Sequence, residues 1–250
     1  IAAGVESMSR ITMGSDMFLQ GEMMTPSPKM SWKYNIIPQG LSAELVAERF
    51  GLDRAELDAY SYESHQRAAR ADDAGKFDRE IIGMSVRTEE KGEFDFRNDE
   101  GIRRSTTLEK LATLKPAFRE DGVITAASSS QISDGSAAIL LASKAAVEKY
   151  DLKPRAKIVS MATAGVDPTI MLTAPIGATR KALERAGLTV DDIGAVELNE
   201  AFASVAVGCA RELNLDFDKV NVYGGAIALG HPLHQPQTAP VVFEKRSPAR

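Results

Sequence analysis

The chain has 250 residues, of which 44% are hydrophobic and 26% charged, and its formal net charge is -5 at pH 7. This length can bury a substantial core in one or two domains, while the acidic balance argues against a nucleic-acid or membrane-surface binder. The single cysteine, Cys209, excludes an internal disulfide framework and a cysteine-rich metal site, and it favours a cytoplasmic location. The sequence shows no apolar run of membrane-spanning length and no signal-peptide pattern.

The sequence predicts one strand and two helices in the first 75 residues. Residues 1–8 predict a strand, and a Met-, Pro- and Ser-rich stretch that continues to about Gly40 predicts irregular structure. Because the chain opens inside an apolar run, we expect that a preceding segment is missing. A helix follows over Ala43–Phe50 and ends at Gly51, and a longer helix starts at a capping box on Asp53 and ends at Gly75.

The middle of the chain alternates short elements with polar connections. In order, the sequence predicts a strand at Ile81–Val86, a solvated charged loop at Glu89–Arg104, a helix capped by Thr106 and stopped by Pro116, a mostly apolar run at Asp134–Ala142 and a short helix at Ser143–Tyr150. A turn at Asp151–Pro154 is a candidate domain boundary.

A regular alternation of strands and helices begins after this turn. The predicted elements are strands at Ala156–Ala162, Ile193–Leu198 and Val220–Tyr223, with helices from Pro175 to Gly187 and from Glu200 to Leu213. Such alternation predicts βαβ units and an α/β fold whose sheet is covered on both faces, with residues 9–120 as a helical insertion. Residues 234–250 contain three prolines and no periodicity, which indicates a disordered or foreign tail.

Two residues of this last part are candidates for chemistry. Asn199 follows a predicted strand at the carboxyl edge of the sheet, where its amide could hold a water or donate to an oxyanion, or it could simply cap the next helix. His231 lies between Gly230 and Pro232 in a glycine-rich loop. It could serve as a general base or oxyanion donor, or it could be an ordinary loop histidine.

Together, these two segments resemble the signature pair of the thiolases. The segment NEAFA at Asn199–Ala203 is followed about twenty residues later by GGAIALGHP at Gly224–Pro232. Three further segments extend the resemblance in the family's order over residues 1–233: GVESMS at Gly4–Ser9, TTLEKLATLKPAF at Thr106–Phe118 and SSSQISDGSAA at Ser128–Ala138.

The resemblance implies a thiolase-like α/β fold, incomplete here, with mixed sheets covered by helices and a helical loop-domain insertion. Residues 1–150 would be the remaining N-terminal domain with the insertion at about 10–120, residues 151–233 the start of the C-terminal domain, and 234–250 a tail foreign to the family. The implied activity is acyl-CoA C-acyltransferase in fatty-acid or lipid metabolism. It would act on coenzyme A thioesters without a cofactor, in a homodimer or homotetramer. The segment SSSQISDGSAA is more similar to that of degradative thiolases and their steroid-handling relatives than to that of synthetic acetoacetyl-CoA enzymes.

The resemblance also implies a role for each matching residue. His231 would activate a nucleophilic cysteine and donate to the thioester oxygen, and Asn199 would hold the water that completes the oxyanion hole. The implied substrate contacts are Arg103 at the nucleotide end of CoA, Ser130 at the pantetheine amide, and Phe118, Met171 and Phe202 in the pantetheine and acyl pocket. Arg104 is expected to be a solvated loop charge.

Several features depart from the family pattern. Both cysteines that thiolase chemistry requires are absent, and Cys209 lies mid-helix among apolar residues, which predicts a buried structural thiol. Ser128 and Gln131 stand where synthetic thiolases often have Asn and Gly. We therefore expect the 250-residue chain to be inactive alone. The alternatives are a non-catalytic acyl-CoA or lipid-binding protein on a thiolase scaffold, and a structural subunit that only contributes an interface.

Overall fold

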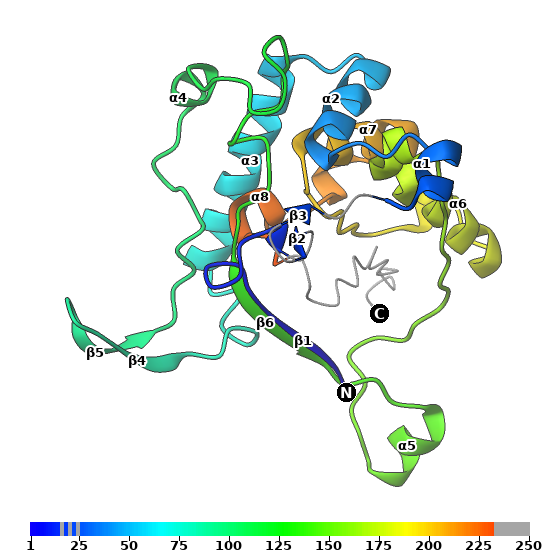
Figure 1. Cartoon of the computed structure of the whole chain (residues 1–250). Coiled ribbons are helices and arrows are strands. Elements are labelled where there is room, and N and C mark those ends of the chain that lie inside the picture. The colour runs from blue at the N-terminus through cyan, green and yellow to red at the C-terminus, as the bar shows by residue number, and fades with distance from the viewer. Residues whose placement is uncertain (16–17, 20–21, 24–25, 233–250) are drawn as a thin grey trace.

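A computed structural model of the chain describes residues 1–15, 18–19, 22–23 and 26–232. Eight labelled α-helices dominate these residues (Figure 1). The helices are α1 (Pro28–Lys33), α2 (Gln39–Phe50), α3 (Arg54–Asp73), α4 (Leu108–Ala112), α5 (Lys144–Lys149), α6 (Ala174–Ala186), α7 (Ala203–Glu212) and α8 (Ala226–Leu229), with 3-10 turns η2 (Pro168–Thr173), η3 (Val190–Asp192) and η4 (Phe217–Lys219). The strands are β1 (Ala2–Ser7), β2 (Phe18–Leu19), β3 (Glu22–Met23), β4 (Met84–Thr88), β5 (Gly92–Phe96) and β6 (Asp134–Ile139). The predicted tail, residues 234–250, lies outside the described residues.

Helix ends follow the capping signals in the sequence. The carboxylate of Asp53 accepts the N–H of Glu56 at 2.9 Å and starts α3. Gly51 and Gly187 end α2 and α6 with φ of 61° and 65°, a left-handed conformation that glycine adopts without steric cost. The predicted ends of these helices are confirmed to within a few residues. The helix predicted from Thr106 is instead capped by Thr107, whose hydroxyl accepts the N–H of Lys110.

The core forms around α7, which packs against α2, α3 and α6. Every residue from Ala203 to Ala210 is buried. Small side chains let the neighbouring helices approach closely: the ring of Phe50 in α2 lies where a side chain on Gly208 would be, and the Ser204 hydroxyl donates to the carbonyl of Ala43 at 3.0 Å. The apolar positions of α7 therefore point to neighbours on all sides, as expected of a fully buried helix.

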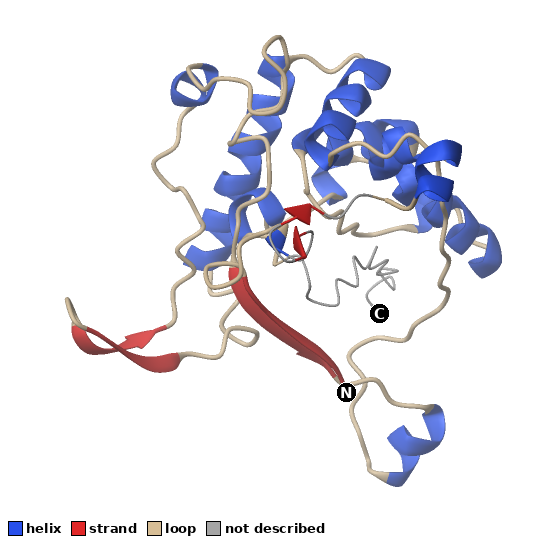
Figure 2. Ribbon diagram, in the orientation of Figure 1, coloured by secondary structure: helices blue, strands red, loops and turns tan. Residues whose placement is uncertain are grey.

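The described strands form three separate antiparallel pairs (Figure 2). The longest pair joins β1 to β6, from Ala2 opposite Ile139 to Ser7 opposite Asp134. β1 confirms the strand predicted for residues 1–8, and β6 occupies the apolar run of residues 134–142. The chain therefore returns to its own beginning after more than a hundred residues, and helices α1 to α4 lie between these two strands in the sequence.

The three strands predicted after residue 155 do not form. Residues 156–162 form neither helix nor strand, Val159 and Met161 are largely exposed, and no strand among the described residues pairs with this segment. Residues 193–198 and 220–223 meet through a parallel bridge between Val196 and Val220. The backbone directions match the predicted βαβ arrangement, but a strand needs a neighbour along its whole length to satisfy its N–H and C=O groups.

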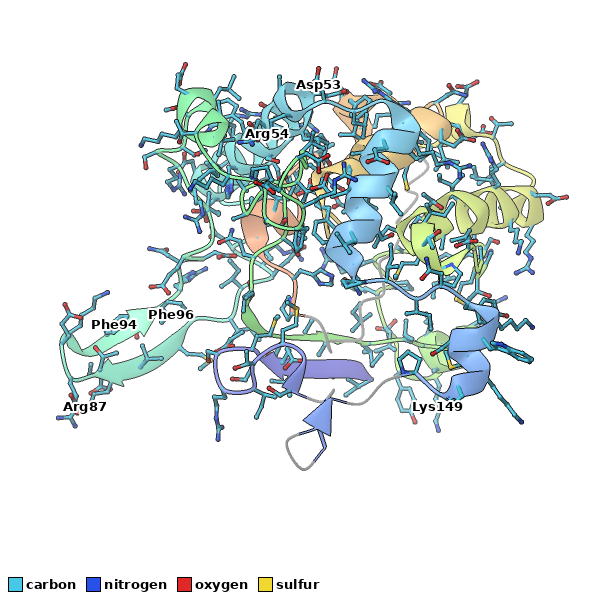
Figure 3. All side chains as sticks on the ribbon, turned by 45° about the horizontal axis from the view of Figure 1, so that its top comes forward. Asp53, Arg54, Arg87, Phe94, Phe96 and Lys149 are labelled. Carbon is cyan, nitrogen blue, oxygen red and sulfur yellow. The ribbon has the colours of Figure 1, made fainter. Side chains whose placement is uncertain are left out.

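The segment expected to be a solvated loop, Glu89–Arg104, contains a strand instead. β5 pairs with β4 as a projecting hairpin, and β4 begins three residues later than the strand predicted at Ile81–Val86. Figure 3 shows Phe94 and Phe96 on this hairpin. Their spacing of two is the strand period, which the neighbouring charged residues obscure in the sequence. Gly92, with φ of 69°, directly follows the turn at residues 89–91.

Four elements remain, the helices α5 and α1 and the strands β2 and β3. The predicted helix near Ser143 is confirmed as α5, whose first turn is capped by the Ser143 hydroxyl, which accepts the N–H of Ala146. The stretch expected to be irregular before Gly40 contains α1, capped by Ser27, together with β2 and β3.

Across the described ranges, no helix combines the length and the apolar character that a membrane crossing would need.

Candidate active site

The backbone leading to Asn199 is held by the side chain of Asn221. The Oδ1 of Asn221 accepts the N–H of Leu198 at 2.7 Å, and its Nδ2 donates to the Leu198 carbonyl at 2.8 Å. Asn221 is 2% exposed and has φ of 47°, a conformation that asparagine tolerates better than most residues. This side chain thus extends the Val196–Val220 pairing by one step and delivers Asn199 to the end of the extended segment.

Asn199 does not cap the following helix. α7 begins only at Ala203, and Phe202 occupies the N-cap position. The residues between them are kept extended by pairing with the SSSQ segment: Ser130 donates its N–H to the Ala201 carbonyl at 3.0 Å, and Ala203 donates to the Ser128 carbonyl at 2.8 Å. The helix-cap interpretation of Asn199 is therefore wrong, and Ser130 lies opposite Ala201, two residues from Asn199.

The structure brings Asn199 and His231 into contact. The Nδ2 atom of Asn199 lies 3.1 Å from the Nε2 atom of His231, and both residues are partly buried. Because an amide nitrogen only donates, this contact makes Nε2 the acceptor and puts the imidazole proton on Nδ1. Burial lowers the pKa of His231 below its usual 6.5, so the ring is neutral at pH 7. A neutral imidazole with Nε2 unprotonated is the form that a general base requires.

An aromatic pair borders this region. The rings of Phe118 and Phe202 are 5.7 Å apart and nearly perpendicular, at 83°. Phe202 is 7% exposed and belongs to the core, whereas Phe118 is 41% exposed. Met171 lies partly buried in η2, which packs against α2 and α7. Phe118 is thus joined to the NEAFA segment through Phe202, and Met171 is positioned separately by the helices around η2.

Arg103 is held by its backbone and keeps its side chain exposed. Its N–H donates to Nδ1 of the buried His65 at 3.1 Å. Arg104 is an exposed loop residue, as expected, and it also forms ion pairs with Asp72 and with Asp73 of α3, the latter at 2.8 Å. Among the described residues, no ion pair engages the Arg103 guanidinium, which leaves it as a positive charge at the surface of this region.

Cys209 does not take part in this arrangement. Its thiol is 1% exposed, and burial, followed by the charge of Glu212, raises its pKa to about 12. The prediction of a buried structural cysteine is confirmed, since only a thiolate is an effective nucleophile. Within the described part of the chain, no group of three or more His, Cys, Asp and Glu residues could hold a metal ion.

Five residues of the region were not singled out from the sequence. They are Tyr60, Ser64, His65, Glu200 and Asn221. Tyr60, Ser64 and Asn221 donate to Glu200 of the NEAFA segment, whereas His65 accepts the N–H of Arg103. Glu200 carried one usable signal, because it is an acidic residue between a predicted buried strand and an apolar helix. Of the others, Tyr60, Ser64 and His65 lie in a predicted helix and Asn221 in a predicted strand, and their partners are distant in sequence.

Comparison with known proteins places the chain in a family. The model of the thiolase N-terminal domain matches residues 1–145, and the model of the thiolase C-terminal domain matches residues 152–238. The chain is 47% identical over 240 residues to steroid 3-ketoacyl-CoA thiolase FadA6 of Mycobacterium tuberculosis, and 46% identical over 241 residues to acetyl-CoA acetyltransferase of Chromobacterium violaceum. Each match covers 93% of this chain, and they cover 57% and 62% of the respective relatives.

A solved structure gives the same result for the fold. Human mitochondrial 3-ketoacyl-CoA thiolase matches with a TM-score of 0.80 and 38% sequence identity, over 92% of this chain and 60% of that chain. The predicted thiolase-like α/β fold is thereby confirmed. The chain spans about 60% of the length of these relatives. The chain belongs to the thiolase family.

Proposed function

We propose that this chain supplies the histidine–asparagine part of an acyl-CoA C-acyltransferase site. The parent activity would be thiolytic cleavage of a 3-ketoacyl-CoA, or Claisen condensation of acetyl-CoA, through a cysteine acyl-enzyme. The observation that carries the proposal is the 3.1 Å contact between Asn199 Nδ2 and His231 Nε2, made by residues 32 apart in a member of the thiolase family.

The geometry supports two steps for His231. As a neutral base, its Nε2 can accept the proton of a cysteine thiol and so generate the thiolate that attacks the thioester carbon. The imidazolium formed in this way can then donate to the developing thioester oxyanion. Asn199 would place a second donor, directly or through a water, and removing one such donor typically lowers kcat by about a hundredfold or more.

The substrate contacts implied by the family resemblance are part of the same proposal. Arg103 presents an exposed guanidinium that suits the phosphates of the CoA nucleotide, and Ser130 lies opposite Ala201, beside the motif of Asn199. Phe118, Phe202 and Met171 would contact the pantetheine and acyl parts. We retain the division into 1–150 and 151–233, the homodimer or homotetramer, the absence of a cofactor and the cytoplasmic location as predictions.

The sequence itself favours a second candidate function. Because Cys209 is the single cysteine and is buried, the 250-residue chain has no other cysteine that could carry the acyl group. A non-catalytic protein that binds acyl-CoA on this scaffold would retain Arg103, Ser130 and Phe202. The contact between a neutral His231 and Asn199 serves proton transfer, which such a binding protein does not need. This contact is why we place the enzyme first.

The decisive experiment compares two versions of the protein. One is the 250-residue chain, and the other is extended upstream with a family-like cysteine segment and given a family-like C-terminus. We expect acetyl-CoA-dependent thiolysis of acetoacetyl-CoA only in the extended version. His231→Ala should abolish this activity, while Cys209→Ser should leave it unchanged. CoA binding without turnover in both versions would favour the binding protein. Turnover by the 250-residue chain itself would contradict the proposed cysteine mechanism.

A further inference from the structure

The one-turn helix α8 precedes His231 and is held at its first turn by Glu200. This carboxylate is 1% exposed. It accepts four hydrogen bonds, from the Ile227 N–H at 3.1 Å, the Ser64 hydroxyl at 2.7 Å, the Tyr60 hydroxyl at 2.8 Å and the Asn221 amide at 2.8 Å. A buried carboxylate with this many donors is well satisfied. Glu200 therefore ties the start of α8 to α3 and to the extended segment that carries Asn199.

Gln131 holds the other end of α8. Its side-chain Nε2 lies 2.9 Å from the carbonyl of Ile227, 3.0 Å from that of Ala228 and 2.8 Å from that of Gly101. The backbone carbonyl of Gln131 accepts the N–H of His231 at 3.2 Å. The last carbonyls of a helix have no partner within the helix, and here a side chain supplies one. Gln131 thus fixes both the end of α8 and the backbone of His231.

α8 depends on such outside support because of its length. A helix of four residues gains too few internal hydrogen bonds to offset the cost of its first turn. The flanking glycines fit the same arrangement. A side chain on Gly225 would collide with the Glu200 carboxylate, and one on Gly230, which has φ of 92°, would collide with the Ser133 hydroxyl. The two glycines thus let the backbone approach the protein's own polar groups closely.

We propose that Glu200 and Gln131 are positioning residues that together hold His231 against Asn199 by fixing α8 at its two ends. Glu200 directly follows Asn199 in the chain, so a single carboxylate is next to one member of the pair and anchors the helix that leads to the other. The catalytic meaning of this arrangement rests on the proposed function, but the arrangement itself does not. Neither residue contacts the reacting atoms in this scheme; both act through His231.

The test measures the imidazole of His231 directly in the 250-residue chain. The chain has three histidines, His65, His231 and His234, so their side-chain nitrogen signals can be assigned by long-range ¹H–¹⁵N correlation with His65→Asn and His234→Asn variants. In the unmodified chain, His231 should show one tautomer, protonated on Nδ1. In Glu200→Gln, the new amide N–H groups would point at the donors that Glu200 accepts, and one or more of these hydrogen bonds is lost. In Gln131→Glu, a carboxylate without hydrogens would face the three carbonyl oxygens and be repelled by them. Both variants should shift His231 towards averaged tautomers.

The chain offers a matched control in Glu44. This carboxylate is also 1% exposed and accepts backbone N–H groups, from Val123 at 2.9 Å and Ile124 at 3.0 Å. Glu44→Gln should therefore change stability but leave the nitrogen signals of His231 as they are. Should Glu200→Gln fail to fold, Ser64→Ala removes one donor to the same carboxylate and should produce a smaller shift of the same kind.

Two results would overturn the proposal. The first is that the signals of His231 stay unchanged in the Glu200 and Gln131 variants, and the second is that Glu44→Gln shifts them equally. The proposed function fails separately, when the extended protein shows no thiolysis although the shifts occur. Where thiolysis is present, the two variants should lower kcat more than they raise KM, because positioning of the base affects chemistry more than substrate binding.

Discussion

Acid should destabilise this protein through His65, which the fold requires to be neutral. The imidazole is 4% exposed, and its Nδ1 accepts the N–H of Arg103. Burial, and then the charge of Arg103, lower the pKa of His65 from 6.5 to about 4. The unfolded chain therefore binds this proton more strongly than the folded chain does. The stabilising contribution is complete above pH 6.5 and is lost as the pH falls towards 4.

The size of this effect follows from the two pKa values. They differ by 6.5 minus 4, or 2.5 units. At about 1.4 kcal/mol per unit, the full loss below pH 4 is roughly 3 kcal/mol, and the part lost between pH 8 and pH 5 is about 2 kcal/mol. His65→Asn keeps an acceptor, because its Oδ1 can occupy the place of Nδ1, but it does not titrate. We expect the variant to lack this part of the pH dependence.

The assay is urea unfolding of both proteins at a series of pH values between 4 and 8. The quantity of interest is the difference in unfolding free energy between them, because other titrating groups such as Glu197 cancel in it. That difference should shift by about 2 kcal/mol between pH 8 and pH 5, to the disadvantage of the unmodified chain. A difference that is constant across this range, or an NMR titration of His65 with a pKa near 6.5, would refute the reasoning.

Three further predictions concern single groups. The thiol of Cys209, with its pKa raised to about 12 by burial, should react with a disulfide reagent at pH 8 only after unfolding, and fast reaction of the folded chain would contradict this. Burial, and then the charge of Glu200, raise the pKa of Glu197 to about 7, so stability falls as the pH rises from 4.5 through 7. Glu197→Gln should add up to about 3 kcal/mol to the unfolding free energy at pH 8 and little at pH 4. Asn199→Asp should raise the pKa of His231, as followed by NMR, because it places a negative charge beside the imidazole. Asn199→Ala adds no charge and should lack this rise, and equal pKa shifts in the two variants would argue against the contact.

The parts of the fold that the sequence predicted well depend on local interactions. The Asp53 side chain caps a backbone N–H three residues away, and Gly51 and Gly187 take a conformation that other residues avoid. Such effects operate within a few residues and can be recognised in one sequence without knowledge of the rest of the chain. The same holds for Ser143 at the start of α5.

Strands were predicted less well because pairing is not local. The apolar residues 156–162 have the composition of a buried strand, yet nothing in that segment shows which neighbour would supply hydrogen bonds. β5 presents the opposite case, since its charged residues concealed an alternation that becomes a strand once β4 lies beside it. A pattern of side chains predicts the faces of a strand, but its existence depends on a partner that the pattern does not identify.

The candidate site divides in the same way. Asn199 and His231 lie in motifs that can be read along the chain, whereas the groups that hold them come from elsewhere. Tyr60 and Ser64 lie four residues apart on one face of α3 and both donate to Glu200, and the next residue, His65, accepts the N–H of Arg103. One helix thus supports both the His231–Asn199 pair and the proposed nucleotide contact. This explains why a long, mostly polar helix with a weak apolar stripe is nevertheless required by the site: its contribution lies in hydrogen bonds to buried acceptors and donors, which hydrophobic periodicity does not reveal.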